Sequence, residues 1–407
     1  MRNFKVVLLL SIVLAGCGES HDLQPNNGIW RAELKVAPGH VLPFNFKLKK
    51  SESDVYSMEI YNAEEVIQVD EIVVQNDSII IKTPVFEGYI SASFTANAMH
   101  GKFIKESLDR VVPFSAIYGK ETRFEVQDTS HFNLSGVWET NFNSGTDEAY
   151  IAKGIFAQQG DRITGTFETT TGDYRFLEGV VDGDSLKIST FDGAHAFLFA
   201  AKASDSTLNG IYYSGNHSQE PFVGRRNHQF ELPDPDSLTF LKAGFDRFDF
   251  NFEAYDGALV SLSDPAYRDK VVLVQIMGTW CPNCLDETKF YVDYLNRNKN
   301  TDLAVVALAF EYAKTRQKAF ERIDRLKVRI GVEYPILLAQ FGTSDKLEAQ
   351  KKLPMLNHIL SYPTTIFIDK KGVVRKIHTG FNGPATGAKF ITFKAEFNTF
   401  VQQLLEE

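Results

Sequence analysis

Two cysteines lie close together in the stretch WCPNC, at positions Cys281 and Cys284, and no other cysteine follows residue 17. A Cys-x-x-Cys pair can bind a metal, form a structural disulfide or exchange electrons with other thiols. A structural bridge across two residues closes a very short loop and contributes little to stability. Structural zinc needs two more ligands, usually from a second close pair, and His358 and His378 lack that spacing. The pattern therefore favours a redox-active dithiol.

The segments around the dithiol predict a buried strand before it and a helix after it. Residues 271–277 form a continuous apolar run, and residues 285–298 have a helical pattern. Pro282 stands where proline suits the first turn of a helix. A helix N-terminus has unpaired N–H groups and a partial positive charge, which favour thiolate over thiol. We therefore expect Cys281 to attack substrate disulfides and the more buried Cys284 to resolve the mixed disulfide.

The remainder of residues 239–407 alternates strand and helix patterns. Further apolar strand runs lie at 302–310, 334–339 and 364–369, and helical patterns lie at 314–330, 345–352 and 388–405. Alternating strands and helices predict an α/β domain with a mostly parallel sheet and a hairpin near its end.

The region before this domain predicts an all-β fold in two units, residues 28–120 and 134–216. Short alternating runs are punctuated by glycine and aspartate turns. GIWRAEL in the first unit corresponds to GVWETNF in the second, and MHGKFI corresponds to LNGIYY, which indicates a tandem duplication. Each unit faintly resembles the meander barrels of lipocalins and avidins. We expect no catalytic cluster in this region, and the polar residues 217–238 are interpreted as a linker.

The N-terminus resembles a bacterial lipoprotein signal. Two cations precede an apolar run from Val6 to Ala15 that is far shorter than the roughly 20 residues needed to span a bilayer. The sequence LAGC then resembles a lipobox, which implies cleavage after residues 1–16 and acylation of Cys17. An ordinary secretory signal with a chance cysteine is the alternative. We expect a lipid anchor at Cys17, a spacer over residues 17–27, and a location in the cell envelope, facing the periplasm or at the outer membrane.

Composition limits the class of partner. The 407 residues suffice for two or three domains, and their hydrophobic (43%) and charged (23%) contents are those of globular proteins. The formal net charge of −9, with no basic stripe, argues against a nucleic-acid partner.

Three stretches together resemble the TlpA-like branch of the thioredoxin fold, the membrane-tethered thiol-disulfide oxidoreductases of bacterial envelopes. They are VVLVQIMGTWCPNCLDE, SYPTTIFIDKKGVV and HTGFNGPATG, and the resemblance covers residues 249–407. It implies that Pro363 is a cis-proline packed against the dithiol and that the Tyr362 backbone pairs with a substrate peptide. We also assign Trp280 and Pro282 to the substrate-binding surface, with Trp280 in a packing and shielding role rather than a catalytic one. A purely packing role for Tyr362 and an ordinary trans Pro363 at a strand edge are the alternatives.

The same resemblance gives Glu287 the acidic position three residues after the second cysteine, with a role in proton movement. An exposed helix carboxylate is the alternative. Two positions depart from the family: Gln275 replaces a buried aspartate of thioredoxin, and Lys289 replaces a common proline. Proton movement then depends on Glu287 or on water.

The predicted function is thiol-disulfide exchange with exported proteins, most simply as a reductase in envelope thiol homeostasis or cytochrome c maturation. No cofactor beyond the Cys281–Cys284 disulfide is expected, and a membrane-borne electron donor would re-reduce the pair. A thiol peroxidase is one alternative, although Gly278 occupies the position where peroxiredoxins have threonine or serine. A lipid-anchored binding module, with the β region as receptor, and a purely structural lipoprotein are the others.

Overall fold

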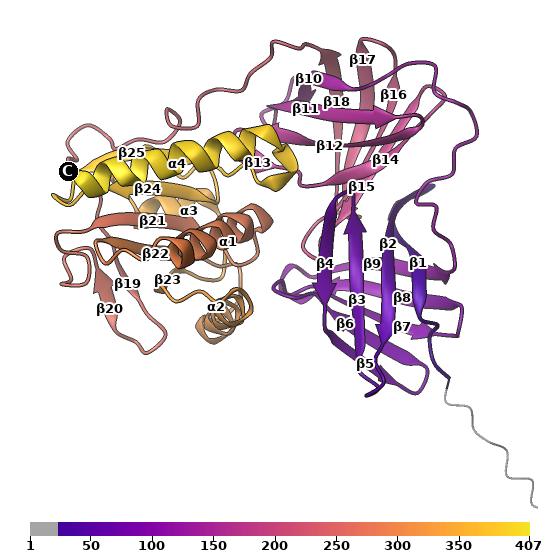
Figure 1. Ribbon diagram of the computed structural model, residues 1–407, viewed down its shortest axis with the longest axis horizontal. Helices are drawn as coiled ribbons and strands as arrows, with labels where there is room; N and C mark the ends of the chain where they lie inside the picture. The colour runs from indigo at the N-terminus through magenta and orange to yellow at the C-terminus, as the bar shows by residue number, and fades with distance from the viewer. Residues whose placement is uncertain (1–22) are drawn as a thin grey trace, which may run out of the picture.

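The computed structural model describes residues 23–407, which fold around three β-sheets (Figure 1). The predicted signal peptide, Cys17 and the first part of the spacer lie outside these described residues. Among the helices of residues 23–407, none combines the length and the apolar character needed to cross a membrane.

The first sheet consists of nine antiparallel strands. Their bounds are β1 Gly28–Ala37, β2 His40–Lys50, β3 Tyr56–Asn62, β4 Glu65–Val69, β5 Glu71–Gln75, β6 Ser78–Lys82, β7 Tyr89–Phe94, β8 Ala98–Lys105 and β9 Arg110–Tyr118. The strand order is β4-β3-β2-β1-β9-β8-β7-β6-β5. Alternate residues of β1, including Trp30, Ala32 and Leu34, point into one core because successive side chains of a strand face opposite sides.

The second sheet also has nine strands, and it closes on itself. Their bounds are β10 Gly136–Phe142, β11 Tyr150–Gln159, β12 Arg162–Thr169, β13 Gly172–Asp173, β14 Leu177–Asp182, β15 Ser185–Phe191, β16 Ala196–Ala203, β17 Thr207–Ser214 and β18 Ser218–Arg226. The order β11-β10-β18-β17-β16-β15-β14-β12-β13 is completed by pairing of β11 with β12. This closure encloses a core rich in aromatic side chains around Trp138, Phe167 and Phe199.

The predicted boundary between the second unit and the linker was wrong. Residues 218–226, which we assigned to the linker 217–238, form β18, and β18 pairs with β17 and β10. The polar residues of this segment alternate with the buried Phe222 and Gly224, so it is a strand with one solvent-facing side. The second unit therefore extends ten residues past 216, to Arg226.

The C-terminal domain is built on a seven-stranded sheet with the order β20-β19-β23-β22-β21-β24-β25. Its strands are β19 Asn251–Glu253, β20 Leu259–Ser261, β21 Val271–Met277, β22 Leu303–Phe310, β23 Ile336–Gln340, β24 Thr364–Ile368 and β25 Val374–Thr379. Its helices are α1 Pro282–Arg297, α2 Arg316–Ile330, α3 Lys346–Lys352 and α4 Ala388–Glu406. Helices α1 and α4 pack together through Phe290, Tyr294 and Phe397.

The expectation of a mostly parallel sheet was wrong, because the sheet is mixed. Only β21, β22 and β23 run parallel to one another. The hairpin β24–β25 adds antiparallel to β21, and the hairpin β19–β20 adds antiparallel to β23. Two hairpins at the edges therefore frame three parallel strands, and the dithiol follows one of these, β21.

The β region packs against the C-terminal domain (Figure 1). Val85, Phe86 and Ala194 from the β region join the hydrophobic core of the C-terminal domain. Ion pairs from α2 add to this contact, with Arg322 on Glu87 and Arg329 on Asp70. The β region is thus in a position to shape access to the dithiol.

Candidate active site

The dithiol lies where a buried strand meets the start of a helix. β21 ends at Met277, and α1 begins at Pro282 with Cys281 as its N-cap. The Cys281 Sγ accepts the backbone N–H of Cys284 at 3.2 Å, and its thiol donates to the Tyr362 carbonyl at 3.3 Å. An N-cap atom lies at the positive end of the helix dipole, which stabilises negative charge on it. This geometry makes Cys281 the better candidate for a nucleophilic thiolate.

The second cysteine has a different environment. Both cysteines are free thiols, Cys281 retains 6% exposure and Cys284 has none. Burial raises the pKa of the Cys284 thiol well above its usual range, and the adjacent Cys281 raises it further. Cys284 therefore stays protonated until a base takes its proton, and only Cys281 has surface that a substrate can reach.

Trp280, Tyr362 and a cis-proline, Pro363, lie around the nucleophile Cys281. The bond between Tyr362 and Pro363 is cis, directly before β24. The Trp280 Nε1 donates to the Phe310 carbonyl at 2.9 Å, and its ring packs against Tyr362 and Tyr312, each with a centroid distance of 5.6 Å. Trp280 is therefore held in one orientation beside Cys281, next to the cis-proline loop.

Glu287 lies beneath the dithiol, inside the domain. It is fully buried, so the alternative of an exposed helix carboxylate was wrong. It accepts hydrogen bonds from Gln275 Nε2 at 2.9 Å, Thr365 Oγ1 at 2.9 Å and Tyr291 Oη at 3.1 Å. Burial raises its pKa to about 7, although these hydrogen bonds oppose the shift. A carboxyl group with this pKa can exchange a proton near neutral pH.

The two departures from the family have defined surroundings. The Gln275 amide donates to Glu287, so it binds the carboxylate at the site where thioredoxin itself has an acid. Lys289 is half exposed, and its Nζ lies 4.0 Å from Asp286. Gln275 therefore takes part in the buried hydrogen-bond network around Glu287, whereas Lys289 lies at the edge of the ion pairs around Asp286.

A second buried carboxylate, which was not predicted from the sequence, holds the loop before the dithiol. Glu311 follows β22 and accepts both the backbone N–H and the Oγ1 of Thr279, each at 2.7 Å. Burial raises the pKa of Glu311. These two bonds fix the backbone two residues before Cys281. No sequence signal distinguishes Glu311 from a surface acid at a strand end.

One loop of the β region covers a flank of the dithiol. The Asn283 side chain donates to the Asp173 carbonyl at 3.1 Å, and the Ser361 hydroxyl donates to the Thr171 carbonyl at 2.8 Å. Between them, a Cβ added to Gly172 would lie 1.9 Å from the Asn283 amide nitrogen, so only glycine fits there. The loop between β12 and β13 therefore lies directly against both the CPNC motif and the cis-proline loop.

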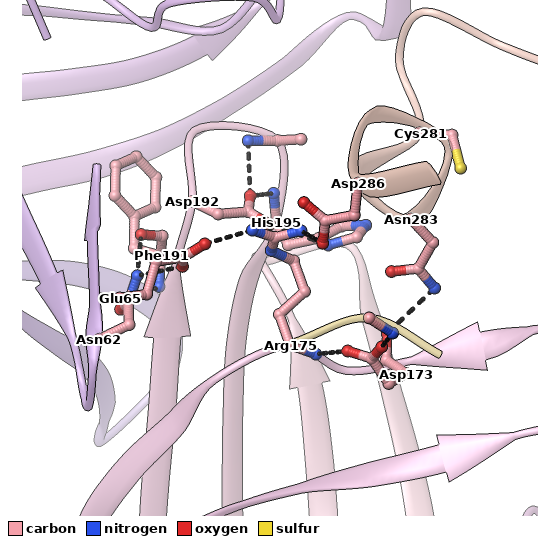
Figure 2. A network of polar contacts seen from close by, with 12 residues as sticks. Asn62, Glu65, Asp173, Arg175, Phe191, Asp192, His195, Cys281, Asn283 and Asp286 are labelled. Atoms are coloured by element: carbon pink, nitrogen blue, oxygen red, sulfur yellow. Dashed lines mark hydrogen bonds and ion pairs between the residues drawn. The ribbon is translucent and has the colours of Figure 1, made fainter. Parts of the chain in front are cut away.

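An arginine from the same region anchors this loop to the active-site helix. Arg175 is buried and pairs with Asp286 of α1, with Glu65 of the first sheet, and with Asp192 at 3.3 Å (Figure 2). Asp192 also contacts His195 at 3.3 Å. Burial disfavours the charged form of Arg175, but its carboxylates outweigh burial and raise its pKa. These residues form the Arg175 cluster, which joins the first sheet, the second sheet and α1. Its member on α1, Asp286, lies two residues after Cys284 in the chain.

Asp173, which directly follows Gly172, is a further buried carboxylate of this region. Asp173 accepts the Gly383 N–H at 2.5 Å, yet burial raises its pKa to about 6. The β region thus holds a cluster of ionisable groups that we did not predict from the sequence. Its members are distant in sequence, so the cluster forms only when the strands pair. Within residues 23–407, no group of three or more His, Cys, Asp or Glu side chains is arranged so that it could hold a metal ion.

The C-terminal domain matches a known protein family and curated relatives. Residues 245–390 match the family model described as Redoxin. The Thioredoxin-like protein YneN of Bacillus subtilis (strain 168) is 30% identical over 132 residues, which are 32% of this chain and 68% of YneN. The Thiol-disulfide oxidoreductase ResA of the same organism is 27% identical over 142 residues, 34% of this chain and 69% of ResA.

Two solved structures are similar to part of this chain. A thiol-disulfide oxidoreductase from Bacteroides fragilis NCTC 9343 is 20% identical and covers 37% of this chain and 99% of its own, with a TM-score of 0.27. A thiol-disulfide isomerase from Corynebacterium glutamicum is 16% identical and covers 41% of this chain and 99% of its own, with a TM-score of 0.31.

Proposed function

The chain belongs, through its C-terminal domain, to the TlpA-like thioredoxin-fold thiol-disulfide oxidoreductases, and from that premise we propose that it reduces disulfides of exported proteins. One observation carries the proposal: the Cys281 Sγ caps α1 and accepts the Cys284 N–H at 3.2 Å, while Cys284 is a fully buried thiol. An attacking sulfur that can carry charge and a protected resolving thiol are what a two-step exchange requires.

In the first step, the Cys281 thiolate attacks one sulfur of the substrate disulfide. The Cys281–substrate S–S bond forms, the substrate S–S bond breaks, and the departing thiolate takes a proton from solvent. Tyr362 and Pro363 lie beside this sulfur, so we assign them to the surface that receives the substrate chain.

In the second step, Cys284 loses its proton and attacks the Cys281 sulfur. The Cys281–Cys284 bond forms, and the second substrate thiolate leaves and is protonated. The substrate thus gains two electrons and the pair loses two. Glu287 accepts the Cys284 proton, because its pKa of about 7 and its position beneath the dithiol suit that transfer. A membrane-borne dithiol donor returns the two electrons. No further cofactor enters these steps.

We place this reaction in the cell envelope. The LAGC sequence at Cys17 is the basis for a lipid anchor there, with a polar spacer between the anchor and β1. Envelope thiol homeostasis and cytochrome c maturation are the settings in which such a reductase would act.

The test is turnover of a protein disulfide by the purified full chain with dithiothreitol as reductant. Cys281→Ser and Cys284→Ser each abolish turnover if the dithiol performs the exchange. Cys17→Ser is the matched control, because it removes the third cysteine without touching the site, and it should leave the rate in solution unchanged. Turnover that survives Cys281→Ser would refute the proposal.

A further inference from the structure

A cavity of about 290 Å³ lies beside the active site, between the β region and the C-terminal domain. Trp280 and Tyr312 of the C-terminal domain line one side, and Lys105, Arg110 and His217 of the β region line the other. Trp280 is the residue directly before the nucleophile. The loop at Gly172 covers the flank where Asn283 lies. Trp280 thus connects the nucleophile to the cavity.

The side chains that line this cavity include cations without matching carboxylates. No residue that lines it is an aspartate or a glutamate. Within residues 23–407, Arg110 has no ion pair and its side chain makes no hydrogen bond; burial lowers its pKa, and no carboxylate offsets this shift. Lys105 has only one hydrogen bond, from its Nζ to the Ala194 carbonyl at 3.0 Å. The carboxylates that act on Lys105 from nearby are already paired, Glu87 with Arg322 and Asp192 with Arg175.

Burial, and after it the charge of neighbouring cations, disfavours the protonated forms of Lys105 and His217. Burial lowers the pKa of Lys105 to about 8, and the charge of Arg110 adds to that shift. Burial also lowers the pKa of His217 to about 4, again with Arg110 and Lys105 contributing. Lys105 and Arg110 are partly buried cations without a counter-ion, which is unfavourable, and the protein as a whole carries a net charge of −9. An anion in the cavity would remove this cost.

We propose that the cavity binds a carboxylate of the disulfide substrate through Arg110 and Lys105, and so selects substrates that carry an acidic residue near the reactive cysteine. The inference rests on the proposed exchange reaction. The aromatic rings of Trp280 and Tyr312 provide the apolar wall for the peptide that bears this carboxylate. A charge-assisted hydrogen bond from an arginine in a partly buried site contributes enough to change binding about tenfold or more.

The experiment measures how fast a disulfide oxidises the reduced full chain in a single turnover. Two peptide disulfides are compared, identical except for an aspartate or an asparagine beside the cysteine. A second pair, 3,3′-dithiodipropionate and its uncharged diamide, tests the same carboxylate on a small molecule. We expect the carboxylate form to react roughly ten times faster in at least one pair at low salt, and the advantage to shrink at high salt.

Arg110→Gln should remove this advantage and leave the uncharged substrates unaffected. Lys202→Gln is the matched control, because it removes an exposed cation far from the cavity lining. If Arg110→Gln does not fold, the salt dependence of the unmodified protein still decides the question. Equal rates for both members of both pairs would overturn the carboxylate site. If no disulfide oxidises the protein, the exchange reaction itself is wrong.

Discussion

Replacement of Arg175 by methionine should uncouple the β region from the active-site helix. Methionine keeps most of the apolar stem and removes the guanidinium, so the carboxylates of Asp286, Glu65 and Asp192 lose their shared cation. The Arg175 side chain is 6% exposed and that of Asp286 is 9% exposed, so solvent screens this pair little. Removal of one partner from a buried ion pair costs about 3–5 kcal/mol, because the remaining charge stays desolvated.

The pH dependence of this loss has a defined sign. Burial opposes ionisation of Asp192, but His195 and Arg175 outweigh it and leave its pKa lowered. A lowered carboxyl pKa stabilises the folded state above the unfolded pKa of about 3.9, and this stabilisation is lost as the pH falls through the folded value. The difference in free energy of unfolding between the Arg175→Met variant and the unmodified protein should therefore be largest near neutral pH and shrink below about pH 4.

Urea unfolding followed by tryptophan fluorescence measures the effect. Trp30, Trp138 and Trp280 lie in the first sheet, the second sheet and the C-terminal domain, so each unit has its own reporter. Arg162→Met is the control, because Arg162 is 54% exposed and its pair with Glu178 should contribute less than about 1 kcal/mol. If Arg175→Met lowers the free energy of unfolding no more than Arg162→Met does, the anchoring role of Arg175 is refuted.

Two other substitutions test the surroundings of the dithiol. Glu287→Gln should slow formation of the Cys281–Cys284 disulfide roughly 100-fold and remove an inflection near pH 7 from its rate profile, as measured by stopped-flow fluorescence. Because the folded pKa of Glu287 is raised, the unmodified protein should lose stability relative to this variant as the pH rises from about 4.3 towards about 7; parallel pH profiles would contradict this. Gly172→Ala should push its loop away from Asn283 and increase the rate at which iodoacetamide alkylates Cys281, as read by mass spectrometry. Unchanged alkylation would mean that the loop does not cover the nucleophile.

The dithiol and its supporting elements could be predicted because their signals are local. A continuous apolar run, a Cys-Pro-x-Cys motif and a helical period are all contained in about thirty residues, and they place Cys281 at a helix start. The membership of the thioredoxin-fold oxidoreductases and the enzyme class were confirmed by the relatives.

The features that could not be predicted depend on long-range pairing. Glu65, Arg175 and Asp286 are far apart in the chain, and only the paired strands and the docked helix bring them together. The burial of Glu287 was also undetermined, because a single acid on a helix does not reveal which face packs inward. Strand β18 escaped prediction since its polar residues alternate with only two buried positions.

The most direct test of the central claim is the site of covalent capture. The reduced Cys284→Ser chain and the reduced Cys281→Ser chain are each mixed with a disulfide-bonded peptide, and the adducts are mapped by mass spectrometry. We expect a stable adduct on Cys281 in the first variant and almost none on Cys284 in the second, because Cys284 is fully buried. Equal adducts in both variants, or an adduct on Cys284 alone, would contradict it.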